Sequence, residues 1–375
     1  MGGRVSLPIS RFPLLASEAR PGETYRNILL ILLAPIGDTL FATPAIRAAR
    51  QAHPNARLSA VVWPSNRAVL ENNPDVDHLL VHPTRADWLR SWKFFRQLRA
   101  DGFDLAIHFA PFHDYYGLLA NVPRRLSLPL PWLFWLLPHG NRRWRYLHAR
   151  DHYLEVLRPL GVSATDRRLV LKISGRQEAF AERYLAEHGH QPGELLLGIH
   201  AGGSGFQGAK RWSPEGFAWV ARELGHGRHV RLVFFGNNED QALSHAVVTA
   251  GVPDGWIDTC GQVSLSQAIG LLSRVDLFVG NDSGPLHLAA ALGTPVVGIY
   301  GPTSILNFHP LGERARAVFG SVPCPGNYGF IGTRPLWARH ECQGECLDSI
   351  DPAQVLNAAR ELLDRQPQLV ISSSG

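Results

Sequence analysis

A short turn, Asp282-Ser283-Gly284, has the residue types and the spacing needed to hold an anion. It follows the apolar run "VDLFVG" and stands directly before Pro285 and the helical pattern "LHLAAALG". A helix that begins at this turn points free backbone N–H groups and the positive end of its dipole beyond the preceding strand. Ser283 can donate to a phosphate oxygen, and Gly284 leaves room for close approach. The stretch predicts a phosphate site, although a plain N-cap explains Asp282 or Ser283 taken singly.

A glycine-rich stretch over 203–208 spells G-x-G-x-x-G after an apolar run, as in dinucleotide-binding proteins. Its context differs from that fingerprint. The helix signal, Ser213 followed by Pro214, comes five residues after the last glycine, and no acidic residue ends a strand about 20 positions later. This argues against a nicotinamide oxidoreductase. The glycines, beginning with Gly203, instead predict close approach of the backbone to a phosphate or to the other domain, with Lys210 and Arg211 beside them.

The elements that must position these groups form two similar series. Apolar runs without polar alternation predict strands of parallel sheets covered on both faces, at residues 27–34, 57–63, 103–110, 194–201, 230–236, 276–280 and 296–301. Helical patterns separate them. We therefore expect an α/β protein with two doubly wound domains, over 27–170 and 190–350, and a closing helix over 351–366. Ligands of such sheets bind beyond the carboxyl ends of the strands, which predicts a site in a cleft between the domains.

Three blocks of the chain carry a family resemblance. The blocks are "ILLILLAPIGDTLFATPAIRAAR", "GGSGFQGAKRWSPEGFAWVARELG" and "NDSGPLHLAAALGTPVVGIYGPT", and "CLDSIDPAQVLNAARELL" resembles a closing helix. Their order and content are similar to those of glycosyltransferase family 9, the ADP-heptose:lipopolysaccharide heptosyltransferases. The resemblance covers most of the chain from 27 to 303.

The resemblance implies a GT-B fold, in which two Rossmann-like domains face each other across a cleft. The amino-terminal domain is expected to bind the acceptor and the carboxyl-terminal domain the nucleotide sugar. The implied reaction is an inverting, metal-independent transfer of heptose from ADP-heptose to the phosphorylated, lipid-linked inner core of lipopolysaccharide. It uses a nucleotide-sugar substrate and no cofactor. A helix amino terminus with a lysine can stabilise the departing diphosphate without a cation.

Site residues follow from the same resemblance. Asp38, at the end of the turn "PIGD", is implied as the general base for the acceptor hydroxyl, or else serves as an N-cap. Lys210 matches the lysine that contacts phosphate, or else is a solvated surface charge. His287 can reach a phosphate or pack against a strand, and Trp212 is expected in the core. The implied donor-binding residues are Asp282, Ser283, Gly284, His287, Glu239 for the ribose hydroxyls, and Gly203.

Charge is distributed unevenly along the chain. Residues 1–168 carry 22 Lys and Arg against 13 Asp and Glu, whereas 169–375 carry 15 against 19. The basic half includes an apolar, Trp-rich segment over 126–138, which is too short to span a bilayer. This segment can rest on an anionic membrane, hold a lipid-linked acceptor, or form a buried loop. Nucleic-acid binding is not expected, because basic and apolar residues interleave. The predicted acceptor-binding residues flank the segment: Arg124, Arg125, Arg142 and Arg143.

Cysteine content and the first residues bear on location. Four cysteines in 375 residues suit a reducing compartment. Cys324, Cys342 and Cys346 can form a metal site with His340, but their spacing is not typical of zinc, and free thiols are the alternative. The first 26 residues lack the apolar core of a secretory signal. We expect a cytoplasmic protein, peripheral on the inner face of the membrane.

Other functions remain open on the same architecture. A sugar-nucleotide epimerase needs no polyanionic acceptor, so it leaves the basic half unexplained. A transferase for another nucleotide sugar would share the donor motif. A non-catalytic nucleotide-binding module would not need Asp38 and Lys210. The sequence alone favours the heptosyltransferase among these.

Overall fold

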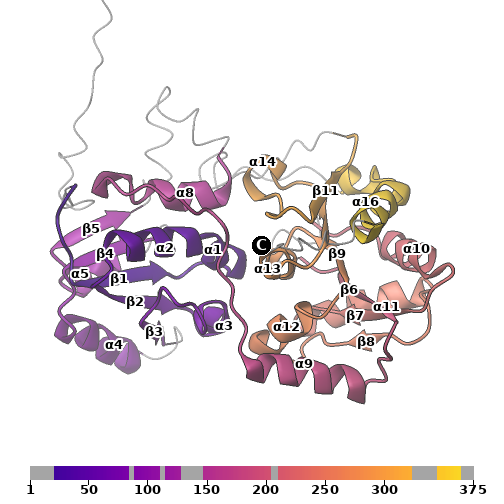
Figure 1. Cartoon of the computed structure of the whole chain (residues 1–375), viewed down its shortest axis with the longest axis horizontal. Helices are drawn as coiled ribbons and strands as arrows, with labels where there is room; N and C mark the ends of the chain where they lie inside the picture. The colour runs from indigo at the N-terminus through magenta and orange to yellow at the C-terminus, as the bar shows by residue number, and fades with distance from the viewer. Residues whose placement is uncertain are drawn as a thin grey trace, which may run out of the picture. The chain divides into compact units, whose positions relative to one another are not determined.

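The computed structural model describes residues 21–83, 88–109, 115–127, 147–203, 210–322 and 344–364. The chain divides into two compact units, Met1–Leu171 and Lys172–Gly375. Each unit contains one of the two parallel sheets that appear in Figure 1, and each sheet is flanked by helices. The α/β class is therefore confirmed.

Unit 1 contains a five-stranded parallel sheet in the order β3-β2-β1-β4-β5. Its strands are β1 (Asn27–Leu32), β2 (Arg57–Val62), β3 (His78–Val81), β4 (Leu105–His108) and β5 (Arg124–Ser127). The central strand β1 is apolar along its length and almost fully buried, since both faces of the sheet are covered. The direction of winding reverses between β1 and β4. This topological switch point is where such sheets bind ligands.

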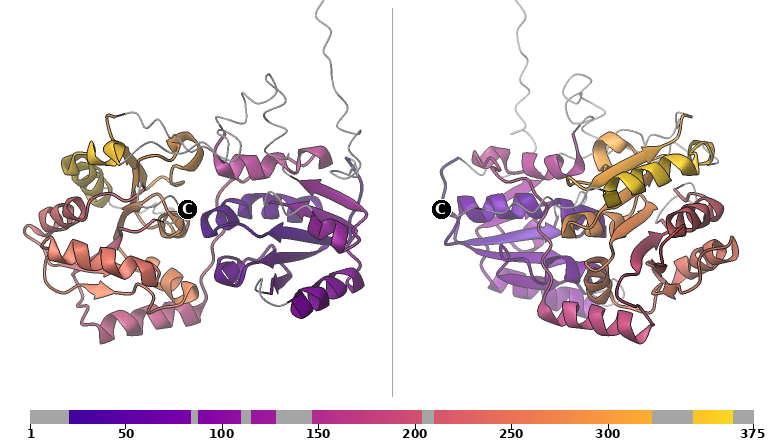
Figure 2. Two further views of the ribbon diagram at one scale, coloured as in Figure 1. Left: turned by 180° about the vertical axis from the view of Figure 1, so that it is seen from behind. Right: turned by 45° about the vertical axis from the view of Figure 1, so that its right-hand side comes forward.

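Helices cover both faces of the unit 1 sheet, as the views in Figure 2 show. On one face α4 (Trp88–Ala100) and α5 (Tyr115–Leu119) pack over an apolar cluster that includes Leu29 and Ile31. A second group of helices consists of α1 (Ile36–Phe41), α2 (Thr43–Ala52) and α8 (Ala149–Glu155), which pack together. The short elements η2 (Pro64–Asn66), α3 (Arg67–Leu70) and η3 (Arg158–Leu160) complete the unit.

Unit 2 contains a six-stranded parallel sheet in the order β11-β10-β9-β6-β7-β8. The strands are β6 (Leu195–His200), β7 (Val230–Phe234), β8 (Ile257–Asp258), β9 (Leu277–Asn281), β10 (Val296–Tyr300) and β11 (Ala315–Phe319). Counted within the unit, this is the 3-2-1-4-5-6 order of dinucleotide-binding sheets. Its switch point lies between β6 and β9.

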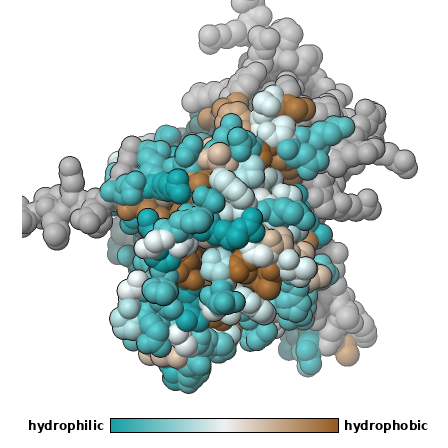
Figure 3. Space-filling model, turned by 90° about the vertical axis from the view of Figure 1, so that its right-hand side faces the viewer, coloured by the Kyte–Doolittle hydropathy of each residue, from teal (hydrophilic) through white to brown (hydrophobic). Residues whose placement is uncertain are grey.

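The helices of unit 2 form two groups. The group α10 (Pro214–Gly225), α11 (Gln241–Thr249) and α16 (Pro352–Asp364) packs around the apolar side chains of β6 and β7. The group α9 (Gly175–Glu187), α12 (Leu265–Leu272) and α13 (Gly284–Leu292) packs together. The short elements are η4 (Asn238–Asp240), α14 (Ile305–Phe308) and α15 (Glu345–Asp348). Figure 3 shows one face of the molecule, on which hydrophilic residues predominate and apolar ones form small separate groups.

The seven predicted strands are confirmed, most with shorter bounds and β9 shifted by one residue, but β3, β5, β8 and β11 were not predicted. The helical stretch after β1 is divided into α1 and α2, because Pro44 has no N–H to continue the first helix and stands in the first turn of the second. Among the described residues, no helix combines the length and the apolar character needed to cross a membrane.

Candidate active site

The turn between β9 and α13 carries the predicted anion site of unit 2. Ser283 occupies the N-cap position of α13, yet its side chain makes no capping hydrogen bond. Its buried Oγ has no hydrogen-bond partner among the residues that the structure describes. The first N–H groups of a helix have no partner within the helix, and Pro285 at its start lacks an N–H. A hydroxyl and free amides at the switch point can therefore bind a phosphate oxygen.

Asp282 contacts two of the predicted site residues, Lys210 and His287. Its Oδ2 lies 3.3 Å from Lys210 Nζ, and its Oδ1 lies 3.2 Å from His287 Nε2. Burial acts to raise the pKa of Asp282, but the hydrogen bond from His287 and the charge of Lys210 outweigh it, so that the pKa lies below its usual value. The carboxylate is thus ionised. Since it would repel a diphosphate at contact distance, its arrangement suits holding Lys210 and His287 rather than touching the phosphate.

Asn281, the last residue of β9, is fully buried and connects the strand ends at the switch point. Its Nδ2 donates to the carbonyl oxygens of Ala201, at 2.8 Å, and Gly202, at 3.0 Å. Its Oδ1 accepts from the backbone N–H of Trp212 at 3.1 Å. These bonds fix the segment that carries Lys210. The sequence analysis missed Asn281, although a polar residue at the end of an apolar strand was a visible signal.

The remaining donor-side predictions fall at the carboxyl ends of β6 and β7. A Cβ added to Gly203 would lie 3.6 Å from Lys210 Cβ, so the two residues are neighbours. Glu239 is exposed in η4. The buried carboxylate of this loop is Asp240, whose Oδ2 accepts from Asn237 N at 2.9 Å. Trp212 lies in the core, as predicted.

In unit 1, Asp38 lies in the first turn of α1, just beyond the carboxyl end of β1. Pro35 occupies the N-cap position, so the alternative that Asp38 is an N-cap is wrong. Tyr153 of α8 donates its hydroxyl to Asp38 Oδ1 at 2.7 Å. Burial, and then the negative charge of Asp38, raise the pKa of Tyr153 well above its usual value. The phenol therefore stays protonated and acts as a fixed hydrogen-bond donor to the carboxylate.

Two polar side chains support the turn that carries Asp38. Asn66 is buried, and its Nδ2 donates to the carbonyl oxygen of Ala34 and, at 3.0 Å, to Thr39 Oγ1. Thr43 Oγ1 donates to the carbonyl oxygen of Leu40 at 2.7 Å. Buried hydrogen bonds of this kind favour one conformation of a turn, because each broken bond leaves an unsatisfied group. Asp38 is held by a structured turn.

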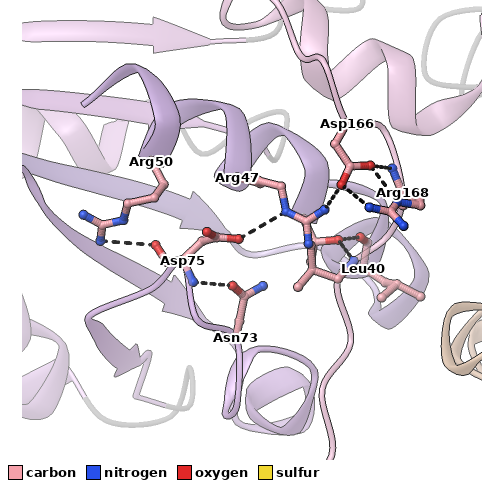
Figure 4. Close-up of polar contacts among 9 residues, drawn as sticks. Leu40, Arg47, Arg50, Asn73, Asp75, Asp166 and Arg168 are labelled. Carbon is pink, nitrogen blue, oxygen red and sulfur yellow. Dashed lines mark hydrogen bonds and ion pairs between the residues drawn. The ribbon is translucent and has the colours of Figure 1, made fainter. Parts of the chain in front are cut away.

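Ion pairs fix α2, the helix that follows Asp38, as Figure 4 shows. Arg47 contacts Asp75 Oδ2 at 3.6 Å and Asp166 Oδ2 at 2.5 Å. One turn further along, Arg50 contacts Asp77 Oδ2 at 2.5 Å. The network joins α2 to the segment before β3 and to the chain that leaves unit 1. It contributes to the rigidity of the helices beside Asp38.

The predicted acceptor arginines are not brought together with Asp38. Arg124 and Arg125 begin β5 and pair in register with the first residues of β4, at the amino ends of the strands. Asp38 lies at the opposite edge of the sheet. Arg124 Nε lies 3.6 Å from Glu23 Oε2, and Arg125 donates to the carbonyl oxygen of Val122 at 2.7 Å. Arg142 and Arg143 lie outside the described residues.

Metal binding by cysteine was left open by the sequence. The residues that the structure describes contain no group of three or more His, Cys, Asp or Glu side chains that could hold a metal ion. Cys260 is a buried free thiol, and Cys346 is buried in the core of unit 2. Cys324, Cys342 and His340 lie outside the described residues.

Two doubly wound parallel sheets, with a candidate anion site at the switch point of unit 2 and the Asp38 carboxylate at that of unit 1, are compatible with a glycosyltransferase that uses a nucleotide sugar. The model of glycosyltransferase family 9 (heptosyltransferase) matches residues 129–327. The chain belongs to this family and is a glycosyltransferase, as the sequence predicted.

Individual relatives agree with this assignment. The lipopolysaccharide core heptosyltransferase OpsX of Haemophilus influenzae is 23% identical over 290 residues, 74% of this chain and 80% of that protein. A glycosyl transferase family 9 structure from Veillonella parvula has a TM-score of 0.76 and 25% identity, covering 93% of this chain and all of that one. The structure of Escherichia coli ADP-heptose lps heptosyltransferase II has a TM-score of 0.71 and 22% identity, covering 90% and 98%. The fold of these proteins is the predicted GT-B fold.

Proposed function

We propose that this glycosyltransferase moves heptose from ADP-heptose to the phosphorylated, lipid-linked inner core of lipopolysaccharide. The observation that carries the donor half of this proposal is the Lys210–Asp282–His287 cluster at the amino terminus of α13. It gathers a lysine, an imidazole, helix amides and the Ser283 hydroxyl at the switch point where a nucleotide diphosphate binds. The names of the similar proteins, a lipopolysaccharide core heptosyltransferase and an ADP-heptose lps heptosyltransferase, support the choice of sugar and nucleotide.

The proposed reaction is a single displacement with inversion. Asp38 removes the proton of the acceptor hydroxyl, whose oxygen attacks the anomeric carbon of the donor. The bond from that carbon to the diphosphate oxygen breaks, and the electron pair leaves with ADP. Lys210, the first turn of α13 and Ser283 stabilise the negative charge that develops on the diphosphate, a task that needs no metal ion. Asp282 acts by holding Lys210 and His287 in place.

The proposed acceptor and location follow from charge. The excess of Lys and Arg over Asp and Glu in residues 1–168 attracts a polyanionic acceptor. A lipid-linked acceptor places the enzyme at a membrane, and we propose the inner face of the cytoplasmic membrane. The remaining proposed donor contacts are Gly203, Gly284 and, for the ribose, Glu239.

Donor preference tests the proposal. In a thermal-shift panel of ADP-, UDP- and GDP-sugars, ADP-heptose should give the largest rise in melting temperature. Lys210→Ala should lower affinity for ADP by about tenfold or more, as expected when a charged hydrogen bond is lost. Lys172→Ala, at an exposed lysine of the same unit, is the matched control. Selective stabilisation by UDP-N-acetylglucosamine would contradict the proposal and favour an epimerase or another transferase.

Transfer to an acceptor tests the role of the base. Asp38→Asn should reduce heptose transfer by at least about a hundredfold, the contribution of a general base. Binding of ADP-heptose should stay within about twofold of the parent, because Asp38 belongs to unit 1. Turnover by Asp38→Asn at a rate close to that of the parent protein would exclude Asp38 as the base.

A further inference from the structure

The outer surface of α4 and α5 combines exposed apolar side chains with a single sign of charge. Leu89 and Trp92 of α4 are 51% and 56% exposed, and Tyr115, Leu118 and Leu119 of α5 are 46%, 40% and 39% exposed. Side chains of this kind are normally scattered singly over a protein. The two helices are in contact, since Arg99 Nε, near the end of α4, donates to the carbonyl oxygen of Leu119 at 2.5 Å.

The charges of α4 are all positive. Between residues 88 and 100 the chain contains Arg90, Lys93, Arg96 and Arg99 and no acidic residue, and all four side chains are exposed. Arg96 lies over the ring of Trp92, with Cζ 5.0 Å from the ring centroid. A guanidinium in this position can contact an anion while the indole beneath it contacts apolar material.

The exposed apolar residues are not needed to cover the sheet. Phe94, Phe95 and Leu98 of α4 already pack on the apolar cluster beneath the helix. Leu89, Trp92, Lys93 and Arg96 lie at helical spacing on the opposite side. The helix therefore packs one apolar face on the core and presents a second face, made of apolar and basic residues, to the solvent.

We propose that this outer face of α4 and α5 docks unit 1 on a bilayer containing anionic lipids. Trp and Tyr side chains favour the boundary between headgroups and acyl chains, and clustered Lys and Arg bind anionic headgroups. The absence of acidic residues from α4 favours a lipid surface over a protein partner with charges of both signs. The inference deepens the proposed function, on which it rests for the need to reach a lipid-linked acceptor.

Vesicle flotation tests the docking surface without any sugar substrate. The full chain should float with vesicles of phosphatidylglycerol and phosphatidylethanolamine and bind vesicles of phosphatidylcholine much more weakly. The double variant Lys93→Glu/Arg96→Glu should weaken binding by at least about 25-fold, since one basic residue near such a surface strengthens binding by about fivefold. Trp92→Ala should weaken it separately and leave its salt dependence unchanged. The matched control, Arg176→Glu/Arg183→Glu on exposed positions of α9, changes net charge equally and should retain binding.

Three outcomes would overturn the proposal. The first is failure of the parent protein to bind anionic vesicles, and the second is binding of the α4 variants that equals that of the control. A dimer of the parent protein that the α4 variants abolish, without vesicle binding, would assign the surface to a second copy of the chain. Heptose transfer to a detergent-dispersed acceptor, measured on the same variants, should be unaffected. If neither the parent protein nor any variant transfers heptose to this acceptor, the result would instead count against the proposed function.

Discussion

The hydrogen bond from Tyr153 to Asp38 gives the proposed base a property that can be measured. Tyr153→Phe removes only the hydroxyl, whose oxygen lies 2.7 Å from Asp38 Oδ1. The ring, which packs edge-on against Phe109 at a centroid distance of 6.1 Å, is retained. The variant should therefore fold, and its effect should be confined to the carboxylate.

The size of the effect follows from the charge and the exposure of the acceptor. A hydrogen bond to a charged group contributes about 1.5–3 kcal/mol. The lower value applies, because Asp38 is only half-buried and water can replace part of the lost bond. At about 1.4 kcal/mol per pH unit, this stabilisation of the ionised carboxylate corresponds to about one pH unit. Removing the donor favours the protonated form.

The assay is the pH dependence of kcat/KM for heptose transfer. The acidic limb of the Tyr153→Phe profile should move to higher pH by about one unit, so that activity on that limb falls about tenfold. The matched control is Tyr116→Phe, which deletes another buried hydroxyl of unit 1, one that lies 2.7 Å from His82 Nε2. An unshifted limb, or a shift of the same size in the control, would refute the positioning role of Tyr153.

Two further predictions concern stability. A Cβ at Gly216 would lie 2.5 Å from the ring of Trp212. Gly216→Ala should therefore lower the free energy of unfolding by about 1–3 kcal/mol in chemical denaturation and also weaken ADP binding. The control Gly225→Ala, at the other end of α10, should change neither quantity. Burial lowers the pKa of His152 from 6.5 to about 4, despite the opposing charge of Asp151. Between these pH values the unfolded chain binds more protons than the folded protein. The free energy of unfolding should therefore fall by up to about 1.4 kcal/mol per pH unit as the pH drops from 6.5 toward 4. His152→Phe should flatten this dependence in thermal melts, and a curve equal to that of the parent protein would exclude His152 as its source.

Much of the fold could be predicted because the signals are local. Seven strands are largely apolar runs without regular polar alternation, and Ser213 with Pro214 marks the start of α10, where the Ser213 side chain accepts from Gly216 N at 3.1 Å. The strands that were missed are edge strands or very short ones, such as β8, which has two residues. Strands of this kind bury less apolar surface and need no continuous apolar run, so their pairing partners define them.

By itself, the sequence determined the α/β class and the family, and it predicted an anion site at the start of α13, because residues 282–287 form one continuous turn and helix whose chemistry is visible in their order. Only the tertiary structure decided which groups meet. It brought Lys210 to Asp282, and it brought Tyr153 to Asp38, which lies 115 positions earlier in the sequence. It also placed Arg124 and Arg125 at the amino ends of the strands, away from Asp38 at the carboxyl ends. Such contacts depend on strand order and register, and these are set by packing over the whole sheet rather than by any local pattern.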